Sequence, residues 1–327
     1  MDLPTDLRTA VEQELETMSS WQLTKGVASL SDRYRHPPRA DGLRFVQSAK
    51  DAAAYIAFRL PATYAAVYFA LRQVQAQFPD WSPHTLLDVG AGPGTVMWAA
   101  AHADLWSDSL EQVTLLEREA NMINMGKRLA GYAIHPAVRE AKWRSMDITQ
   151  PWGTPVHDLV VTSYVLGELP LDSRAAFLGQ LWEMTNHSLV IIEPGTPRGF
   201  EHIREARERL LGLGGKMVAP CPHDRPCPME HDDWCHFAQR VARSRLHRQT
   251  KGGELGYEDE KFSFVGMARL AGRGIRGRIV RHPQVRKGHV RLQLCTPDGL
   301  TGMVITRRNR DLYRRARKVE WGDSFEY

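Results

Sequence analysis

The stretch LLDVGAGPG, from Leu86 to Gly94, decides the fold. An apolar strand over residues 85–89 runs directly into a cluster of glycines, and the pattern predicts a helix over residues 95–103 immediately afterwards. Glycines let the backbone turn tightly and pass close to a ligand. By itself, such a turn between a strand and a helix is only a general sign of nucleotide binding.

An acidic residue beside the glycines narrows the choice of ligand. The spacing is G-x-G-x-G, made by Gly90, Gly92 and Gly94, and Asp88 lies two positions before the first glycine. Loops that bind pyrophosphate usually read G-x-G-x-x-G and have no carboxylate so near. A carboxylate suits a ligand with a positive end, and S-adenosylmethionine carries both an ammonium and a sulfonium group.

Two further carboxylates follow in the order that this cofactor requires. Glu117 ends the next predicted strand, where it can accept hydrogen bonds from both ribose hydroxyls. Asp147, in the segment SMDIT, precedes the following strand and can reach the adenine amino group. This order indicates a class I methyltransferase with a Rossmann-like, doubly wound α/β sheet. A tight turn with incidental carboxylates and an NAD-binding fold are the alternatives.

The next strand ends in TSYVLGELP, residues 162–170, at the edge that faces the transferred methyl group in this fold. We expect Ser163 to help hold the cofactor, and Tyr164 and Glu168 are the candidate catalytic residues. A plain packing role for Tyr164 is the alternative. The edge has neither the N/D-P-P-Y tetrapeptide of base methylation nor the cysteine nucleophile of cytosine C5 methylation, so the residues identify no acceptor atom.

Four regions are predicted from the pattern of the rest of the chain. Apolar runs over 159–163 and 189–192 indicate buried parallel strands, whereas a polar helix is expected near Asp233 to Gln249. The regions are a helical N-terminal cap, the cofactor-binding domain, a Cys-rich insertion, and completing strands with a basic C-terminal β extension, over residues 1–80, 81–200, 201–260 and 261–327.

The four cysteines predict a metal site. Three have the spacing C-x5-C-x7-C and the fourth follows 60 residues later in a predicted strand: Cys221, Cys227, Cys235 and Cys295. In a reducing compartment, such cysteines act as metal ligands more often than they form disulfides. Zinc and a four-iron cluster both accept four thiolates. The irregular spacing and two Cys-Pro pairs favour the 4Fe-4S cluster, while His223 and His236 are alternative zinc ligands.

The charge of the chain is unevenly distributed. Of 327 residues, 43% are hydrophobic and 25% are charged, which fits a folded globular chain. The block from Arg269 to Lys318 carries 15 Lys and Arg side chains, 13 of them Arg, against two Asp. Such a block predicts binding of a polyanion, and the excess of Arg favours RNA. The alternative is a solvated charged face.

The N-terminus and the apolar stretches bear on location. The segment MDLPTDLRTAVEQEL has no secretory signal and is too acidic for a transit peptide. The most apolar stretch, residues 52–71, is interrupted by Arg59 and Pro61, so no membrane span is expected. We therefore predict a cytoplasmic protein, most simply a monomer.

With these residues in view, the chain resembles the mitochondrial small-ribosomal-subunit methyltransferase-like assembly factors and their bacterial relatives. The resemblance is carried by six stretches: RLPATYAA (59–66), SPHTLLDVGAGPGT (82–95), IIEPGTPRGF (191–200), APCPHDRPCP (219–228), DWCHFAQR (233–240) and YEDEKFSFV (257–265). It implies binding of S-adenosylmethionine, a four-iron cluster held by all four cysteines, and association with the small subunit. The lack of a transit peptide implies a bacterial-type member.

Two functions follow as expectations. The first is a methyltransferase that acts on small-subunit rRNA. The second is a non-catalytic assembly factor that binds rRNA and the cofactor without transferring a methyl group. A methyltransferase for a protein or a small molecule is a third reading, but it makes no use of the basic block.

Overall fold

The computed structural model describes residues 2–16, 18–35, 46–230, 232–242 and 256–327. Its main element is an eight-stranded mixed sheet. The strands are β1 (Thr85–Val89), β2 (Gln112–Glu117), β3 (Lys142–Ser145), β4 (His157–Ser163), β5 (Thr185–Pro194), β6 (Lys216–Ala219), β7 (Phe237–Ala242) and β8 (Tyr257–Ala268). The expected doubly wound sheet is confirmed.

The strand order is β3-β2-β1-β4-β5-β8-β6, and β7 pairs with the outer part of β8. Strands β1 to β5 run parallel, with β1 between β2 and β4, whereas β8 is antiparallel to β5. The strand order changes direction at β1: the chain continues from β1 to β2 and β3 on one side, and to β4 and β5 on the other. A ligand crevice is expected at the carboxyl ends of the strands beside such a switch point.

The side chains alternate along each strand, so that the two faces of the sheet contribute to two different core clusters. In β1, Leu86 packs into one core cluster and Leu87 into another, and Leu159 and Val160 divide in the same way in β4. Successive residues of a strand point to opposite faces, so apolar runs without polar alternation are buried on both sides.

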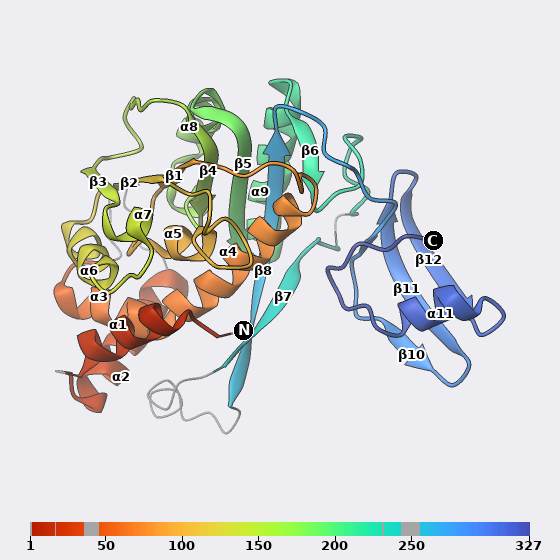
Figure 1. Ribbon diagram of the computed structural model, residues 1–327, viewed down its shortest axis with the longest axis horizontal. Coiled ribbons are helices and arrows are strands. Elements are labelled where there is room, and N and C mark those ends of the chain that lie inside the picture. The colour runs from red at the N-terminus through yellow and green to blue at the C-terminus, as the bar shows by residue number, and fades with distance from the viewer. Residues whose placement is uncertain (1, 17, 36–45, 231, 243–255) are drawn as a thin grey trace.

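Helices cover both faces (Figure 1). The first face packs against helices from the N-terminal half, and the second against α8 and α9. The helices are α1 (Thr5–Leu15), α2 (Ser20–Arg35), α3 (Ala49–Phe58), α4 (Leu60–Gln75), α5 (Thr95–Ala100), α6 (Ala120–Ala130), α7 (Pro136–Arg139), α8 (Leu171–Glu183) and α9 (Pro197–Gly212). The expected helical N-terminal cap corresponds to α1–α4.

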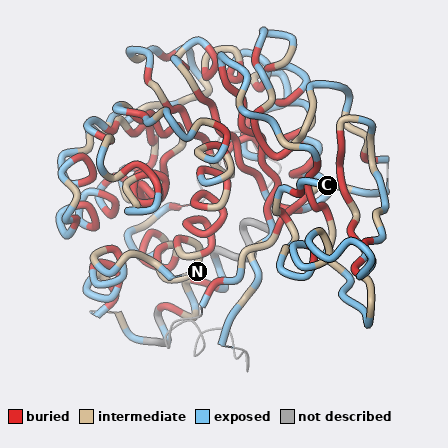
Figure 2. Tube along the Cα trace, turned by 45° about the vertical axis from the view of Figure 1, so that its right-hand side comes forward, coloured by how far each residue is buried: buried red, intermediate tan, exposed pale blue. Residues whose placement is uncertain are grey.

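Helix α4 is the most deeply buried of the N-terminal helices (Figure 2). Tyr64, Val67 and Leu71 are fully enclosed and belong to the main core. Within the described residues no single helix has the length and apolarity of a membrane span, and α3 with α4 would meet that test only as a pair bent by 54°.

A second, smaller sheet forms a C-terminal lobe (Figure 1). It consists of β9 (Arg278–Ile279), β10 (Gln284–Arg286), β11 (His289–Thr296) and β12 (Gly299–Thr306), and α11 (Arg310–Ala316) packs on it. Its own core includes Ile279, Leu294 and Phe325. The expected β extension is therefore a separate layer, and within 261–327 only the start of the region, in β8, completes the main sheet.

The helix predicted near Asp233 to Gln249 is wrong where the structure describes it. Residues 237–242 form β7, which pairs antiparallel with β8, and residues 243–255 lie outside the described residues. Phe237 and Val241 are the buried residues of this strand. These two residues are four positions apart, and residues at that spacing share one face of a helix and also one face of a strand. The pattern therefore fits both structures, and pairing with β8 selected the strand.

Candidate functional site

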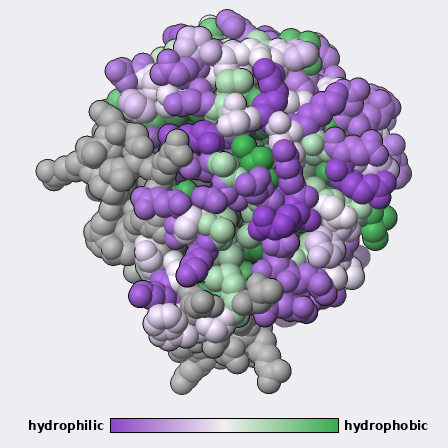
Figure 3. All heavy atoms as spheres, turned by 90° about the vertical axis from the view of Figure 1, so that its left-hand side faces the viewer, coloured by the Kyte–Doolittle hydropathy of each residue, from purple (hydrophilic) through white to green (hydrophobic). Residues whose placement is uncertain are grey.

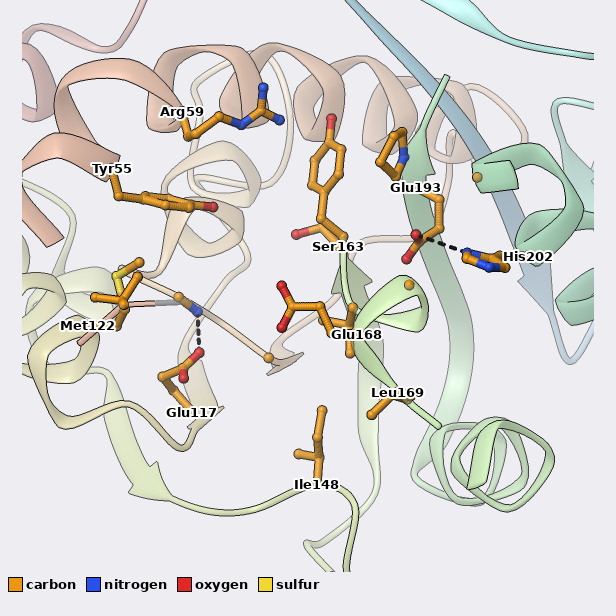
Figure 4. A pocket seen from close by; sticks show the side chains of 18 of the residues that line it. Tyr55, Arg59, Glu117, Met122, Ile148, Ser163, Glu168, Leu169, Glu193 and His202 are labelled. Atoms are coloured by element: carbon orange, nitrogen blue, oxygen red, sulfur yellow. Dashed lines mark hydrogen bonds and ion pairs between the residues drawn. The ribbon is translucent and has the colours of Figure 1, made fainter. Parts of the chain in front are cut away.

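A cavity of about 710 Å³ opens at the carboxyl ends of β1, β2, β4 and β5. Residues from the α3–α4 junction and from the start of β8 close its other walls. Figure 4 shows its lining, with Glu117 and Met122 on one side and Glu193 and His202 on the other. The cavity lies at the switch point of the sheet and is large enough for a cofactor-sized ligand.

The glycine loop forms part of this cavity. Gly90, Gly92 and Gly94 all have positive φ, at 74°, 54° and 83°, a conformation that glycine adopts without strain. A Cβ at Gly92 would meet only the Tyr55 hydroxyl, 4.0 Å away, so its backbone faces open space. Gly90 and Gly92 line the cavity, whereas Gly94 packs against Met97 and starts α5.

Glu117 ends β2 and is held beneath the loop. Its Oε2 accepts a 2.8 Å hydrogen bond from the Gly92 amide, and its Oε1 accepts one of 2.8 Å from the Glu119 amide. Burial raises the pKa of this carboxyl, and the two amides oppose that rise. Glu117 therefore lies in the cavity wall with its position fixed by two backbone amides.

Asp88 lies elsewhere than expected. Its side chain is fully buried below the loop, it does not line the cavity, and neither carboxylate oxygen has a hydrogen-bond partner among the described residues. Burial raises its pKa well above the usual range, and the nearby Glu117 raises it further. A direct contact with a ligand in the cavity is therefore not available to Asp88 in this conformation.

Asp147 is at the rim. It is exposed, and its Oδ1 accepts hydrogen bonds from the amide and hydroxyl of Thr149, at 3.0 and 2.7 Å. Its neighbours Met146, Ile148 and Thr149 line the cavity instead. The segment therefore reaches the cavity with apolar side chains that can cover a flat ring. The Asp147 carboxylate instead forms hydrogen bonds within its own tight turn.

Ser163, Tyr164 and Glu168 all line the cavity. Tyr164 has a φ of 61°, which is uncommon for a residue with a side chain and marks a constrained position at the end of β4. Its hydroxyl donates a 2.8 Å hydrogen bond to Glu260 Oε1. Burial raises the pKa of Tyr164, and the charge of Glu260 adds to that rise, so the phenol stays neutral and committed to Glu260.

Arg59 completes this contact from the N-terminal cap. Its two terminal nitrogens donate to the Glu260 carboxylate at 3.2 and 3.0 Å, and its guanidinium lies 5.4 Å from the centre of the Tyr164 ring. We call Arg59, Tyr164 and Glu260 the clasp. It joins the α3–α4 junction, the end of β4 and the start of β8 across one wall of the cavity.

A buried pair, Glu193 from β5 and His202 from α9, also lines the cavity. They are 1% and 6% exposed, and His202 Nδ1 lies 3.6 Å from Glu193 Oε2 (Figure 4). Glu193 Oε1 accepts a 2.8 Å hydrogen bond from the Leu166 amide, which holds the residues just after β4.

Five residues of the cavity wall carry no motif that predicted them as site residues: Tyr55, Arg59, Glu193, His202 and Glu260. Glu193 has a visible signal, because it interrupts an apolar strand in IIEP. A buried charge seldom survives in a strand without a partner. Arg59, Glu193 and Glu260 also fall within stretches that carried the family resemblance.

The four cysteines come together beside the C-terminal lobe. Cys295 is buried in a cluster with Phe200 and Val280, and Cys227 and Cys235 pack against the same cluster. Burial raises the pKa of Cys235 well above its usual range, and the other three thiols each raise it further, so all four lie near one another. Burial likewise raises the pKa of Cys295 to about 12.

The group is loosely arranged for a single ion. Within the described ranges no set of three or more His, Cys, Asp or Glu lies close enough to hold one metal ion. Of the alternative zinc ligands, His223 Nε2 lies 3.8 Å from Cys295 Sγ, and His236 stacks on Trp234 with ring centres 5.1 Å apart.

Two buried arginines stand next to the cysteines. Arg207 and Arg278 are 3% and 1% exposed. Arg207 donates to the carbonyl oxygens of His223 and Arg225, and Arg278 to those of Pro220 and Gly322. They bind the backbone around the cysteines and place positive charge beside the thiols, which buried thiolates require for stability.

The basic block forms an exposed surface on the C-terminal lobe. A hollow over α11, which we call the α11 hollow, is lined by five cations and one aromatic ring: Arg307, Arg310, Tyr313, Arg314, Arg317 and Lys318. By contrast, the face on the side of α3 and α6 is hydrophilic around a partly hydrophobic centre (Figure 3).

The strand order and the site together define the class. A sheet in the order found here, with one antiparallel strand next to β5 and a glycine loop after β1, is the class I methyltransferase fold. Residues 49–326 match the family described as mitochondrial small ribosomal subunit Rsm22, and the chain belongs to that family.

Three relatives show the range of similarity. The human mitochondrial ribosome assembly protein METTL17 is 34% identical over 291 residues, which cover 82% of this chain and 61% of that protein. The mitochondrial Rsm22-cox11 tandem protein 2 of Schizosaccharomyces pombe is 26% identical, with 83% and 42% covered. The mitochondrial ribosome assembly protein RSM22 of Saccharomyces cerevisiae is 22% identical, with 83% and 66% covered.

These relatives overturn one prediction. Their names place them in mitochondria, so the expectation of a cytoplasmic protein is wrong. The chain spans about 40 to 65% of the length of the relatives that it matches. The N-terminal residues were therefore a poor guide to location.

Solved structures with similar folds are methyltransferases. Magnesium protoporphyrin IX methyltransferase of Synechocystis, solved with bound cofactor, is 13% identical with a TM-score of 0.42, and covers 83% of this chain and 100% of its own. A putative RNA methyltransferase of Pyrococcus horikoshii is 12% identical with a TM-score of 0.40, with 76% and 96% covered. The fold assignment rests on the strand order rather than on these values.

Proposed function

We propose that this protein binds S-adenosylmethionine and acts on small-subunit ribosomal RNA as a methyltransferase. The observation that carries the proposal is the cavity at the switch point, where Gly92 presents open backbone next to the fixed carboxylate of Glu117. Family membership supplies the ribosomal partner, because the relatives are named for ribosome assembly.

The residues present fit this cofactor. Glu117 would accept hydrogen bonds from the ribose hydroxyls, and Met122 and Ile148 would cover the adenine ring. Gly92 leaves room for the amino-acid end, because a Cβ there would meet only the Tyr55 hydroxyl at 4.0 Å. When bound, the cofactor supplies an electrophilic methyl group on a sulfonium, which needs an acceptor atom placed in line with the breaking bond.

The chain's own residues would position that acceptor. The clasp and the Glu193–His202 pair line the cavity beyond the ends of the neighbouring strands β4 and β5. Tyr164 stays protonated on Glu260 and so would act as a wall and hydrogen-bond partner rather than as a base. This part of the cavity would exclude water and orient the acceptor.

Methyl transfer is tested with labelled S-adenosylmethionine. The full chain is incubated with small ribosomal subunits from cells lacking the gene and with subunits from wild-type cells. Label entering only the RNA of the deletion-strain subunits supports an rRNA methyltransferase. Absence of label, with cofactor and particle binding retained, contradicts catalysis.

A non-catalytic assembly factor is the second candidate. The specific observation in its favour is the clasp, because the candidate catalytic residue Tyr164 is already committed to Glu260 and paired with Arg59. In this version the bound cofactor would stabilise the fold that recognises immature rRNA. Subunit binding that depends on cofactor, without transfer of label, supports it.

We further propose that the four cysteines hold a 4Fe-4S cluster rather than zinc. Zinc and a four-iron cluster both accept four thiolates. The irregular spacing of the cysteines and the two Cys-Pro pairs favour the cluster. Arg207 and Arg278 would balance its negative charge.

The metal is identified in protein purified without oxygen. About four iron atoms per chain, with a brown colour lost on exposure to air, supports the cluster. Stoichiometric zinc in a colourless protein refutes it. In that case His223 becomes a candidate ligand, because it lies next to Cys295.

For RNA, we propose the α11 hollow as the contact surface. Arginine can pair with phosphate and stack on bases, and Tyr313 offers a ring for stacking. Replacing Arg310 and Arg314 with alanine should weaken rRNA binding. It should also make the slope of the logarithm of the binding constant against the logarithm of the salt concentration shallower by about 1.5. Alanine at Arg139 and Lys142, exposed residues outside the hollow, provides the control. An equal effect of both pairs contradicts the proposal.

A further inference from the structure

Glu168 occupies the middle of the cavity. It ends the short helix η1 (Leu166–Glu168) that follows β4, and its side chain projects between Glu117 and Ile148 on one side and Ser163 on the other (Figure 4). Neither a hydrogen bond nor an ion pair holds its carboxyl in the described part of the chain. It is accessible from the cavity, so a ligand there can contact it.

Most other charged groups that face Glu168 are already paired. They are Arg59 with Glu260, Arg118 with Glu119, and Glu193 with His202. Glu117 is held by two amides. The remaining ionisable groups of the walls are Tyr55, Tyr164, Arg198, Asp259 and Lys261, and Asp259 is paired with Arg240. Among the described residues, Glu168 is therefore the carboxyl of the cavity that has neither a hydrogen bond nor an ion pair.

The same surroundings act on the pKa of Glu168. Limited access to bulk water raises the pKa, Arg118 opposes this rise, and Glu117, Glu193 and Glu119 add to it, so that the pKa reaches about 8. A positive group bound beside Glu168 would have the opposite effect and favour the charged carboxylate.

The strand order locates where such a positive group would be. With ribose at the end of β2 and the amino-acid end over the loop after β1, the sulfur that joins them faces the next strand, β4. Glu168 follows β4 directly. S-adenosylmethionine carries a positive sulfonium at this atom, whereas its product S-adenosylhomocysteine has a neutral thioether. Both carry the same ammonium.

We propose that Glu168 is a specificity-determining residue that distinguishes the charged sulfonium of S-adenosylmethionine from the neutral thioether of S-adenosylhomocysteine. This rests on the proposed cofactor site. The share of protein with S-adenosylmethionine bound then depends on the ratio of the two compounds. Once the methyl group has been transferred, the product has lost its positive sulfonium and is bound more weakly. Glu168 performs this role without acting as a base.

The pH dependence has a defined sign. Glu168 gains its negative charge as the pH rises through about 8. The affinity for S-adenosylmethionine therefore increases between about pH 7 and pH 9, relative to that for S-adenosylhomocysteine. Because both ligands share the ammonium, its own titration cancels in the ratio of the two affinities.

Calorimetric titration of the full chain tests this with both ligands at both pH values. The variants are Glu168→Gln, which removes the charge and keeps the shape, Glu168→Asp, which keeps the charge, and Glu183→Gln as a control. Glu183 is exposed at the end of α8 and outside the cavity. At about pH 9, where Glu168 is charged, Glu168→Gln is expected to weaken binding of S-adenosylmethionine about tenfold, equivalent to about 1.4 kcal/mol, and that of S-adenosylhomocysteine less than twofold.

Each other outcome overturns the inference. Equal weakening of both ligands by Glu168→Gln would mean that Glu168 contributes shape and not charge. Unchanged affinity for both ligands in Glu168→Gln would mean that Glu168 takes no part in their recognition, while the proposed cofactor site would stand. If the wild-type chain binds neither ligand, the proposed function fails as well.

Discussion

Replacing Gly92 with aspartate is expected to abolish cofactor binding while leaving the fold intact. A side chain at this position points into open cavity, with only the Tyr55 hydroxyl within 4.0 Å. The new carboxylate would face Glu117, whose Oε2 already accepts the Gly92 amide at 2.8 Å. Two like charges about 5 Å apart at an effective dielectric constant of about 20 repel by roughly 3 kcal/mol.

That repulsion lies within the protein and lowers the stability of the fold, whereas the added side chain takes up the space that the ligand needs and is expected to lower the affinity for S-adenosylhomocysteine at least about a hundredfold. The positive φ of 54° adds about 1 kcal/mol to the loss of stability, and denaturation with urea would measure the sum. Gly153→Asp is the matched control, because a side chain there meets nothing within 4 Å and the residue is outside the cavity. Calorimetric affinity within threefold of wild type in Gly92→Asp would refute the placement of the site.

Three further predictions concern the clasp, the buried acid and the cysteines. Arg59→Met and Glu260→Gln should show a coupling of about 1 to 2 kcal/mol in a double-mutant cycle followed by denaturation, and additive effects would contradict the clasp. Asp88→Asn should stabilise the protein increasingly as the pH rises above the ordinary Asp range, since a raised pKa makes ionisation of Asp88 destabilising; equal pH profiles would contradict this. Cys235→Ser should remove most iron from anaerobically purified protein without changing cofactor affinity, and unchanged iron would exclude it as a ligand.

Local patterns were sufficient for much of the site. The glycine spacing and the position of Glu117 after a strand depend on residues close in the chain, and both lie where they were expected. Asp88 and Asp147 show the limit of this reasoning. Spacing placed them near the cofactor, but packing enclosed Asp88 below the loop and a local turn engaged Asp147.

The sequence by itself determined the α/β class, the glycine loop after the first strand, the cysteine set and the concentration of positive charge, because each is expressed in short-range periodicity, spacing or composition. Only the tertiary structure decided that Arg59 meets Glu260, 201 residues away, and that Glu193 pairs with His202 in a cavity wall. It also decided that residues 237–242 form a strand. These outcomes depend on partners brought together by sheet pairing and core packing, whose identity no local pattern specifies.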